Sequence, residues 1–250
     1  MRLPWYFGIL LYGHRPKRSH LFLSYSIFPN FFYFSQRTII FILQNMIGII
    51  DYNAGNITSV ERALKHLNID FILSKNPQEL ENCDKLIFPG VGDAAYAMQE
   101  LKKSGFESFI KDKVANGTLL LGICLGSQII FELSEEGNTP CLSLISGQIK
   151  HFYTIDPSLK NELKVPHMGW NNLEFQGDCP ILKDLPANAD YYFVHSYVIC
   201  PDDTSVIKAK ADYGIKVPAV IQSGNIFACQ FHPEKSGQAG LQILKNFCLM

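Results

Sequence analysis

From residue 46 onward, short apolar runs alternate with longer stretches in which apolar residues recur every three or four positions. The runs have the composition of buried strands, and the stretches between them have the spacing of amphipathic helices. Thr58 and Glu61 fit a capping box at the start of the first helix. The expected strands cover 46–51, 71–73, 85–88 and 118–123, and the expected helices about 58–67, 94–103 and 106–115. Strands that alternate with helices predict a parallel, doubly wound α/β sheet.

The pattern changes after about Ser143, where short segments of alternating apolar and polar residues follow one another. These segments cover 148–152, 170–175, 191–200, 206–211, 219–222 and 226–230. A turn at 223–225 predicts a hairpin between the last two, and a helix is expected over about 237–247. We therefore predict one α/β domain over residues 46–250, with a doubly wound, mostly parallel sheet and an antiparallel C-terminal part.

Residues 1–45 follow neither pattern. They contain five basic and no acidic side chains, and they hold 12 of the 31 aromatic residues of the chain. An uncharged stretch over 19–36 is interrupted by Pro29-Asn30 and is aromatic rather than aliphatic, which makes a transmembrane helix or a signal peptide a poor fit. We expect this extension to lie outside the fold, and a mis-assigned start ahead of Met46 would explain it.

Charge and cysteine usage exclude several classes of protein. The net charge of −1 gives no electrostatic footprint for nucleic acid. The seven cysteines are odd in number and scattered, without a C-x-x-C motif, so neither a disulfide framework nor a structural zinc site is expected. No group of His, Cys and acidic residues has the spacing of metal ligands. These features favour a reduced, cytoplasmic protein that needs no metal or cofactor and has no membrane partner.

One cysteine stands where a strand is expected to turn sharply into a helix. Cys124 lies between Gly122 and Gly126, with Leu119–Leu121 before them and Ile129–Phe131 after them. Such a nucleophile elbow lifts a side chain off the sheet onto a helix N-terminus, whose dipole favours a thiolate. The alternative is that Gly-x-Cys-x-Gly forms only a tight turn, since most cysteines are buried apolar residues.

The segment His232-Pro233-Glu234 offers the base and the orienting acid that a thiol nucleophile requires. It follows the expected strand over 226–230 directly. Proline restricts the backbone between the two side chains, so a carboxylate can bind one imidazole nitrogen and leave the other for the thiol. A His-Pro-Glu turn on the surface, without a catalytic role, is the alternative.

The turn Gly90-Val91-Gly92 follows the expected strand over 85–88 and is a candidate for binding an oxyanion. Glycines let backbone N–H groups approach a substrate closely. Right-handed crossovers would place this turn beside Cys124, at the carboxyl edge of the sheet where ligands bind. A simple strand-to-helix turn remains an equal alternative. Two histidines in crowded polar and aromatic segments, His167 and His195, are also hard to dismiss as surface residues.

Together these motifs resemble the class I (triad) glutamine amidotransferases. Four further stretches narrow the resemblance to the HisH family, the glutaminase subunit of imidazole glycerol phosphate synthase: 51–56 (DYNAGN), 166–171 (PHMGWN), 192–197 (YFVHSY) and 231–237 (FHPEKSG). The resemblance runs from Met46 to the C-terminus. Residues 1–45 have no counterpart in it.

The resemblance implies roles for individual residues. Cys124 would attack the side-chain amide of glutamine, His232 would protonate the departing ammonia and then activate water, and Glu234 would orient His232. Oxyanion donors would come from the backbone of Leu125 and of Gly90, Val91 and Gly92. Glutamine would be held with the help of Gln128, Ser196 and Tyr197.

The resemblance also implies a partner, a HisF-type (β/α)8-barrel cyclase subunit that forms a heterodimer with the glutaminase. Ammonia would pass into the barrel, where imidazole glycerol phosphate and aminoimidazole carboxamide ribotide are made in histidine biosynthesis. The oxyanion turn would point away from the site until the partner and its ligand bind. The docking surface would include Asn53, Asn56, His167, Met168, Trp170 and Asn171, although Trp170 could instead be a core residue.

Two other interpretations remain open. A paralogue with the same triad could supply ammonia to another acceptor, such as an amidino-sugar pathway. A non-catalytic scaffold could also share the fold, although the complete set of Cys124, His232 and Glu234 argues against it.

Overall fold

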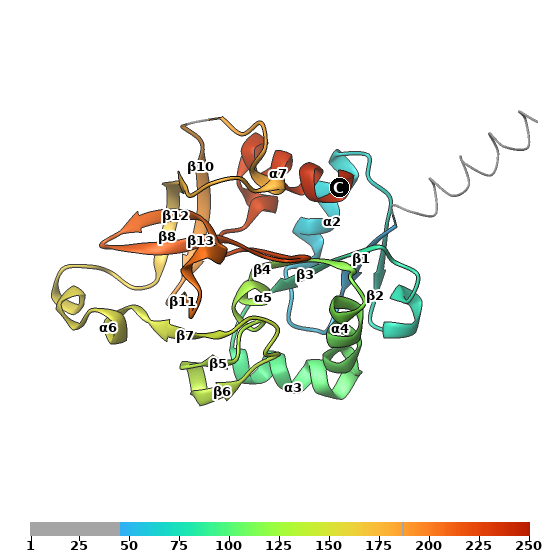
Figure 1. The fold of residues 1–250 in the computed structure, drawn as a ribbon, viewed down its shortest axis with the longest axis horizontal. Coiled ribbons are helices and arrows are strands. Elements are labelled where there is room, and N and C mark those ends of the chain that lie inside the picture. Colours follow the sequence, from blue (N-terminus) through green and yellow to red (C-terminus); the bar gives the residue numbers. More distant parts are fainter. Residues whose placement is uncertain (1–45, 187) are drawn as a thin grey trace, which may run out of the picture. The chain divides into compact units, whose positions relative to one another are not determined.

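A computed structural model describes residues 46–186 and 188–250 (Figure 1). The prediction that residues 1–45 lie outside the fold concerns a segment outside these described ranges. Within them, the alternation of strands and helices expected from the sequence is confirmed.

The central feature of the fold is an eight-stranded sheet in the order β2-β1-β3-β4-β14-β13-β12-β9. The first five strands in that order are parallel, and the last three join by antiparallel pairing. Their bounds are β1 Ile47–Ile50, β2 Phe71–Ser74, β3 Lys85–Gly90, β4 Leu119–Cys124, β9 Glu174–Phe175, β12 Ile207–Tyr213, β13 Ile215–Ser223 and β14 Ile226–Cys229. The predicted fold class, a mostly parallel sheet with an antiparallel C-terminal part, is confirmed.

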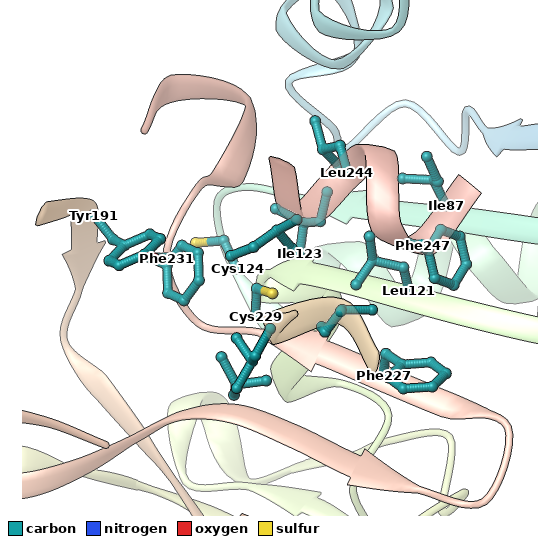
Figure 2. Close-up of a cluster of buried hydrophobic side chains, with 14 of the residues drawn as sticks. Ile87, Leu121, Ile123, Cys124, Tyr191, Phe227, Cys229, Phe231, Leu244 and Phe247 are labelled. Carbon is teal, nitrogen blue, oxygen red and sulfur yellow. The ribbon is translucent and has the colours of Figure 1, made fainter. Parts of the chain in front are cut away.

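Helices cover both faces of this sheet, as a doubly wound fold requires. Helices α2 (Ile57–His66) and α7 (Gly237–Leu249) lie on one face, and α3 (Ala94–Ser104) and α4 (Phe106–Ala115) lie on the other (Figure 1). Because side chains alternate along a strand, Leu121 of β4 packs on the first face and Leu120 on the second. Figure 2 shows Leu244 and Phe247 of α7 against the strands of the first face.

Two smaller sheets flank the C-terminal part. One pairs β8 (His167–Asn172) with β10 (Asp190–His195), and the other has the order β11-β7-β5-β6. The second sheet and the short helix α6, which follows β7, have these bounds: β5 Leu133–Ser134, β6 Thr139–Pro140, β7 Gly147–His151, α6 Phe152–Ile155 and β11 Tyr197–Pro201.

Three local predictions were wrong. The segment 191–200 is not one strand, because the chain leaves one sheet after β10 and enters another at β11, and 170–175 is likewise divided between β8 and β9. Continuous alternation of apolar residues cannot reveal such a change of sheet. The capping box also fails, since α2 begins at Ile57 and both Thr58 and Glu61 lie inside it.

Two observations concern the disulfide framework and the transmembrane helix, both of which the sequence argues against. All seven cysteines lie in the described ranges and all are free thiols. In residues 46–186 and 188–250, none of the helices has the length and apolar character needed to cross a membrane.

Helix α7 provides a test of the packing on the first face. Phe247 is fully buried there, whereas Leu249, two residues later, is 65% exposed. Replacing Phe247 with Ala should lower the free energy of unfolding by about 3–5 kcal/mol, because a large buried side chain leaves a cavity. The matched change Leu249→Ala should alter it by less than about 0.5 kcal/mol. Urea unfolding followed by circular dichroism measures both, and equal effects would contradict this packing.

Candidate active site

The junction between β4 and the short helix α5 (Leu125–Gln128) has the geometry of a nucleophile elbow. Cys124 adopts φ 54° and ψ −111°, a conformation that residues other than glycine rarely populate. Such strain persists only where the surrounding structure enforces it, and it is common at catalytic residues. The elbow is therefore more than an ordinary tight turn.

Close backbone packing holds this junction against the neighbouring strand. Gly126 lies so near β3 that a methyl group on its Cα would collide with the carbonyl oxygen of Phe88. Gly90, the last residue of β3, is the direct partner of Cys124 in the parallel register of β3 and β4. The oxyanion turn and the cysteine are thus neighbours, as the order of the predicted strands implied.

His232 and Glu234 form a buried pair just beyond β14. The Nδ1 atom of His232 lies 2.7 Å from Oε1 of Glu234, and both side chains are almost fully buried. Burial opposes the charged imidazolium, but the neighbouring Cys124 and Glu234 outweigh burial and raise the pKa of His232 to about 10. In the described part of the chain, the buried Nε2 atom makes no hydrogen bond of ordinary length. This leaves Nε2 available to a thiol or a reacting group.

Backbone contacts fix His232 in place. Its N–H donates to the carbonyl of Tyr192 at 2.9 Å, and its carbonyl accepts from the hydroxyl of Ser236 at 2.6 Å. The same hydroxyl accepts the N–H of Tyr192 at 2.9 Å. Ser236 therefore ties the histidine segment to β10. Sequence reasoning missed this role because the partner of Ser236 is distant along the chain.

A cavity of about 310 Å³ opens beside Cys124 and brings most of the predicted site residues together. Asn53 and Asn56, which were predicted to belong to the docking surface, are not among the residues that line it. The predicted residues that line it are Val91, Gly92, Cys124, Leu125, Gln128, Ser196, Tyr197 and His232. Gly90 lies next to Cys124 by strand register, and Glu234 lies behind His232.

Gln128 is held rigidly at the wall of this cavity. Its side-chain amide donates to the carbonyl of Tyr197 at 3.1 Å and to Oε1 of Gln230 at 2.9 Å. The Tyr197 carbonyl also accepts from Nδ1 of His195 at 2.7 Å. The start of β11 is thereby fastened to both α5 and β10.

The two histidines of the crowded segments form a buried pair. Nε2 of His195 lies 3.1 Å from Nδ1 of His167, and Nε2 of His167 lies 3.4 Å from Nδ2 of Asn171. Since Nδ1 of His195 donates to a carbonyl, its Nε2 must accept when the ring is neutral. Burial lowers the pKa of His195 to about 3 and that of His167 to about 4, so both rings are neutral at pH 7.

Glu136 is a site residue that the sequence analysis missed. It lines the cavity, where its Oε2 accepts the N–H of Ala94 at 2.9 Å. Burial raises the pKa of its carboxyl above the ordinary value. It lies in a turn that has no motif, and only the fold brings it opposite Cys124.

Val91 and Gly92 of the Gly90–Gly92 turn line the cavity, but the N–H of Val91 is bonded elsewhere. The N–H of Val91 donates to the carbonyl of Ala54 at 2.8 Å, in the loop after β1. That N–H is therefore already bonded within the chain. The expected reorientation of the turn when a partner binds stays a prediction.

The predicted docking residues differ in exposure. Met168 and Trp170 are 62% and 59% exposed, so Trp170 is a surface residue and not part of the core. His167 does not fit a docking surface, because its ring is buried and stacked against Phe193 and Tyr213. Asn171 donates to the carbonyl of Asp212, also at the surface. Asn53 and Asn56 lie in the loop between β1 and α2, where Asn53 is exposed and Asn56 partly so.

No set of three or more His, Cys, Asp or Glu side chains within 46–186 and 188–250 is arranged to hold a metal ion.

A thiol at a strained elbow, with a buried imidazole–carboxylate pair beside it, is the arrangement that hydrolases and transferases of the cysteine triad type use. The chain matches the family model "Glutamine amidotransferase class-I" over residues 48–250. A solved structure titled as a glutamine amidotransferase superposes with a TM-score of 0.62 at 20% identity, covering 80% of this chain and 98% of that one.

Two curated relatives, each named imidazole glycerol phosphate synthase subunit HisH, match at higher identity. The protein of Geobacillus sp. (strain WCH70) is 46% identical over 203 residues, which cover 81% of this chain and 95% of that protein. The protein of Methanocaldococcus jannaschii is 44% identical over 205 residues, which cover 81% of this chain and 98% of that protein. The chain belongs to the class I glutamine amidotransferase family and, within it, to the HisH family.

The buried pair predicts a dependence of stability on pH. The pKa of His232 rises from an ordinary value of 6.5 to about 10 on folding. A raised pKa stabilises the fold fully below pH 6.5, and this contribution disappears as the pH rises towards 10. Replacing Glu234 with Gln removes one cause of the rise, so the loss of stability between these pH values should be smaller. Urea unfolding between pH 6.5 and 10, together with an NMR titration of the His232 ring, measures this difference. Identical pH profiles of stability for the wild type and the Glu234→Gln variant would contradict the pairing.

Proposed function

We propose that this chain hydrolyses glutamine through Cys124, His232 and Glu234, as the glutaminase subunit of an imidazole glycerol phosphate synthase in histidine biosynthesis. The observation that carries this assignment is a strained cysteine in a cavity shared with a buried imidazole–carboxylate pair. The identity to HisH proteins over nearly their whole length supports the choice of pathway.

The proposed chemistry begins with the thiolate of Cys124, which attacks the side-chain amide carbon of glutamine and forms a carbon–sulfur bond. The imidazolium of His232 gives its proton to the leaving nitrogen as the carbon–nitrogen bond breaks, so ammonia departs and a thioester remains. Neutral His232 then takes a proton from water, which attacks the thioester. Glutamate leaves, and the thiolate and imidazolium are regenerated. Glu234 holds the ring in the orientation that presents Nε2 to the reaction.

The oxyanion of each tetrahedral intermediate would be held by the backbone N–H groups of Leu125 and of the Gly90–Gly92 turn. Because the N–H of Val91 is bonded to Ala54, the Gly90–Val91 peptide must turn over before it can contribute. The isolated chain should therefore hydrolyse glutamine slowly.

The polar groups of the cavity suggest how glutamine is oriented. The carboxylate of Glu136 suits the α-ammonium group of the substrate, because it is the acidic side chain on the wall of the cavity. Gln128, fixed by Gln230 and Tyr197, would form the floor beside Ser196. These contacts would select an amino acid with a free α-amino group.

The partner we propose is a HisF-type (β/α)8-barrel cyclase in the cytoplasm. Ammonia is mostly protonated at neutral pH and is then no nucleophile, so transfer within a complex protects it. Met168 and Trp170 are exposed apolar side chains of the kind that anchor interfaces. A paralogue feeding another acceptor would share the triad, and only its partner and that partner's substrate would distinguish it.

The first test removes the nucleophile. Cys124→Ala in the complex with the barrel subunit should reduce glutamine-dependent product formation by about three orders of magnitude or more, because no thioester can form. Ammonia-dependent product formation should persist. Cys200→Ala, a cysteine outside the cavity, serves as the control and should leave both activities unchanged. Near-normal glutamine turnover by the Cys124 variant would refute the assignment.

The second test concerns the docking surface. Trp170→Ala should weaken binding of the barrel subunit at least about tenfold, since a large apolar anchor is lost, and should leave the thermal midpoint unchanged because the side chain is exposed. Calorimetric titration measures the affinity. Phe175→Ala, which removes another partly exposed aromatic side chain, is the matched control. Unchanged affinity, or an unfolded Trp170 variant, would contradict this surface.

A further inference from the structure

Tyr52 carries a buried hydroxyl group that the proposed reaction does not use. Its side chain is fully buried, and the hydroxyl makes no hydrogen bond to any described residue. Its ring packs on Phe88 with the ring centroids 5.3 Å apart. Buried hydroxyl groups are nearly always paired, so an unpaired one in a native fold calls for an explanation.

This hydroxyl lies directly behind the oxyanion turn. A methyl group built on Gly90 would come within 2.7 Å of the Tyr52 hydroxyl and within 2.6 Å of the N–H nitrogen of Gly126. The hydroxyl therefore occupies the space where β3 ends, beside the start of α5. It is also close enough to Cys124 for the two groups to interact electrostatically.

The peptide between Gly90 and Val91 presents its N–H to the carbonyl of Ala54. If this peptide turned over, as the proposed oxyanion site requires, its N–H would face Cys124 and its carbonyl oxygen would take the place that the N–H leaves. That oxygen would then face the Ala54 oxygen, and two acceptors repel each other. The turned-over state would need a hydrogen-bond donor within reach of Gly90, and the Tyr52 hydroxyl lies beside that residue.

We propose that the Tyr52 hydroxyl is this donor: it bonds the carbonyl oxygen of Gly90 when the Gly90–Val91 peptide turns over, and so stabilises the competent oxyanion site. The proposal rests on the proposed function, because it assumes that the turn binds the oxyanion. Tyr52 is then a positioning residue that does not touch the substrate.

Three further features fit this role. Tyr52 and Ala54 belong to the same loop after β1, so the donor and the carbonyl that now holds Val91 are two residues apart in the chain. Burial, reinforced by Cys124, raises the pKa of Tyr52, which keeps the phenol protonated and able to donate. Gly90 must also stay glycine, since any side chain there would take the space of the hydroxyl.

The test replaces Tyr52 with Phe in the complex with the barrel subunit and its ligand, which removes only the oxygen. The kcat of glutamine hydrolysis should fall about tenfold, the loss of one useful hydrogen bond, with KM for glutamine changed less than twofold. Ammonia-dependent product formation should be normal. Thermal unfolding should show no loss of stability, because the hydroxyl makes no bond in the resting chain.

Tyr191→Phe is the matched control, since Tyr191 is also buried with an unpaired hydroxyl but packs on Phe231, away from the turn. Its kcat should stay at the wild-type value. Wild-type kcat in the Tyr52 variant would overturn the proposal, as would an equal fall in both variants. A shift in the pH profile of Cys124 alkylation in Tyr52→Phe would overturn it too, because the hydroxyl would then act on the thiolate. A wild-type complex without glutaminase activity would instead reject the proposed function.

Discussion

The structure depends on a close approach of two backbones at the ends of β3 and β4. Gly126 sits against the carbonyl of Phe88, where a single methyl group would collide. Glycine permits this contact, and the chain turns beside it at Cys124 with a positive φ. The contact also brings the end of β3, and with it the oxyanion turn, next to the sulfur. One close contact therefore accompanies the placement of both the proposed nucleophile and the Gly90–Gly92 turn.

The position of β14 in the sheet determines where His232 and Glu234 lie. This strand pairs in parallel with β4, so the segment after it emerges on the same edge as Cys124. Proline and two backbone hydrogen bonds hold His232 there, and Glu234 fixes its ring. Ser196, between β10 and β11, and Tyr197, the first residue of β11, line the cavity from the two smaller sheets. The parallel half thus carries the proposed triad, and both halves contribute residues to the cavity beside it.

The sequence was informative wherever chemistry is local. The elbow, the His-Pro-Glu segment and the Gly-Val-Gly turn each follow a recognisable strand, and parallel strands place their ends together. It was uninformative wherever a role depends on packing between distant segments. Glu136 and Ser236 have no motif, the burial of His167 depends on rings from two other strands, and the break at Ser196 is invisible in an alternating pattern. The unpaired hydroxyl of Tyr52 likewise emerges only from the fold.

The central claim is that Cys124 forms a thioester with glutamine inside a complex. The most direct measurement is to incubate the complex with a reactive glutamine analogue, with and without the ligand of the barrel subunit, and to locate the label by peptide mass spectrometry. We expect one label, on Cys124, that forms faster when the barrel ligand is present. A label on another residue, or none on Cys124 in the fully liganded complex, would contradict it.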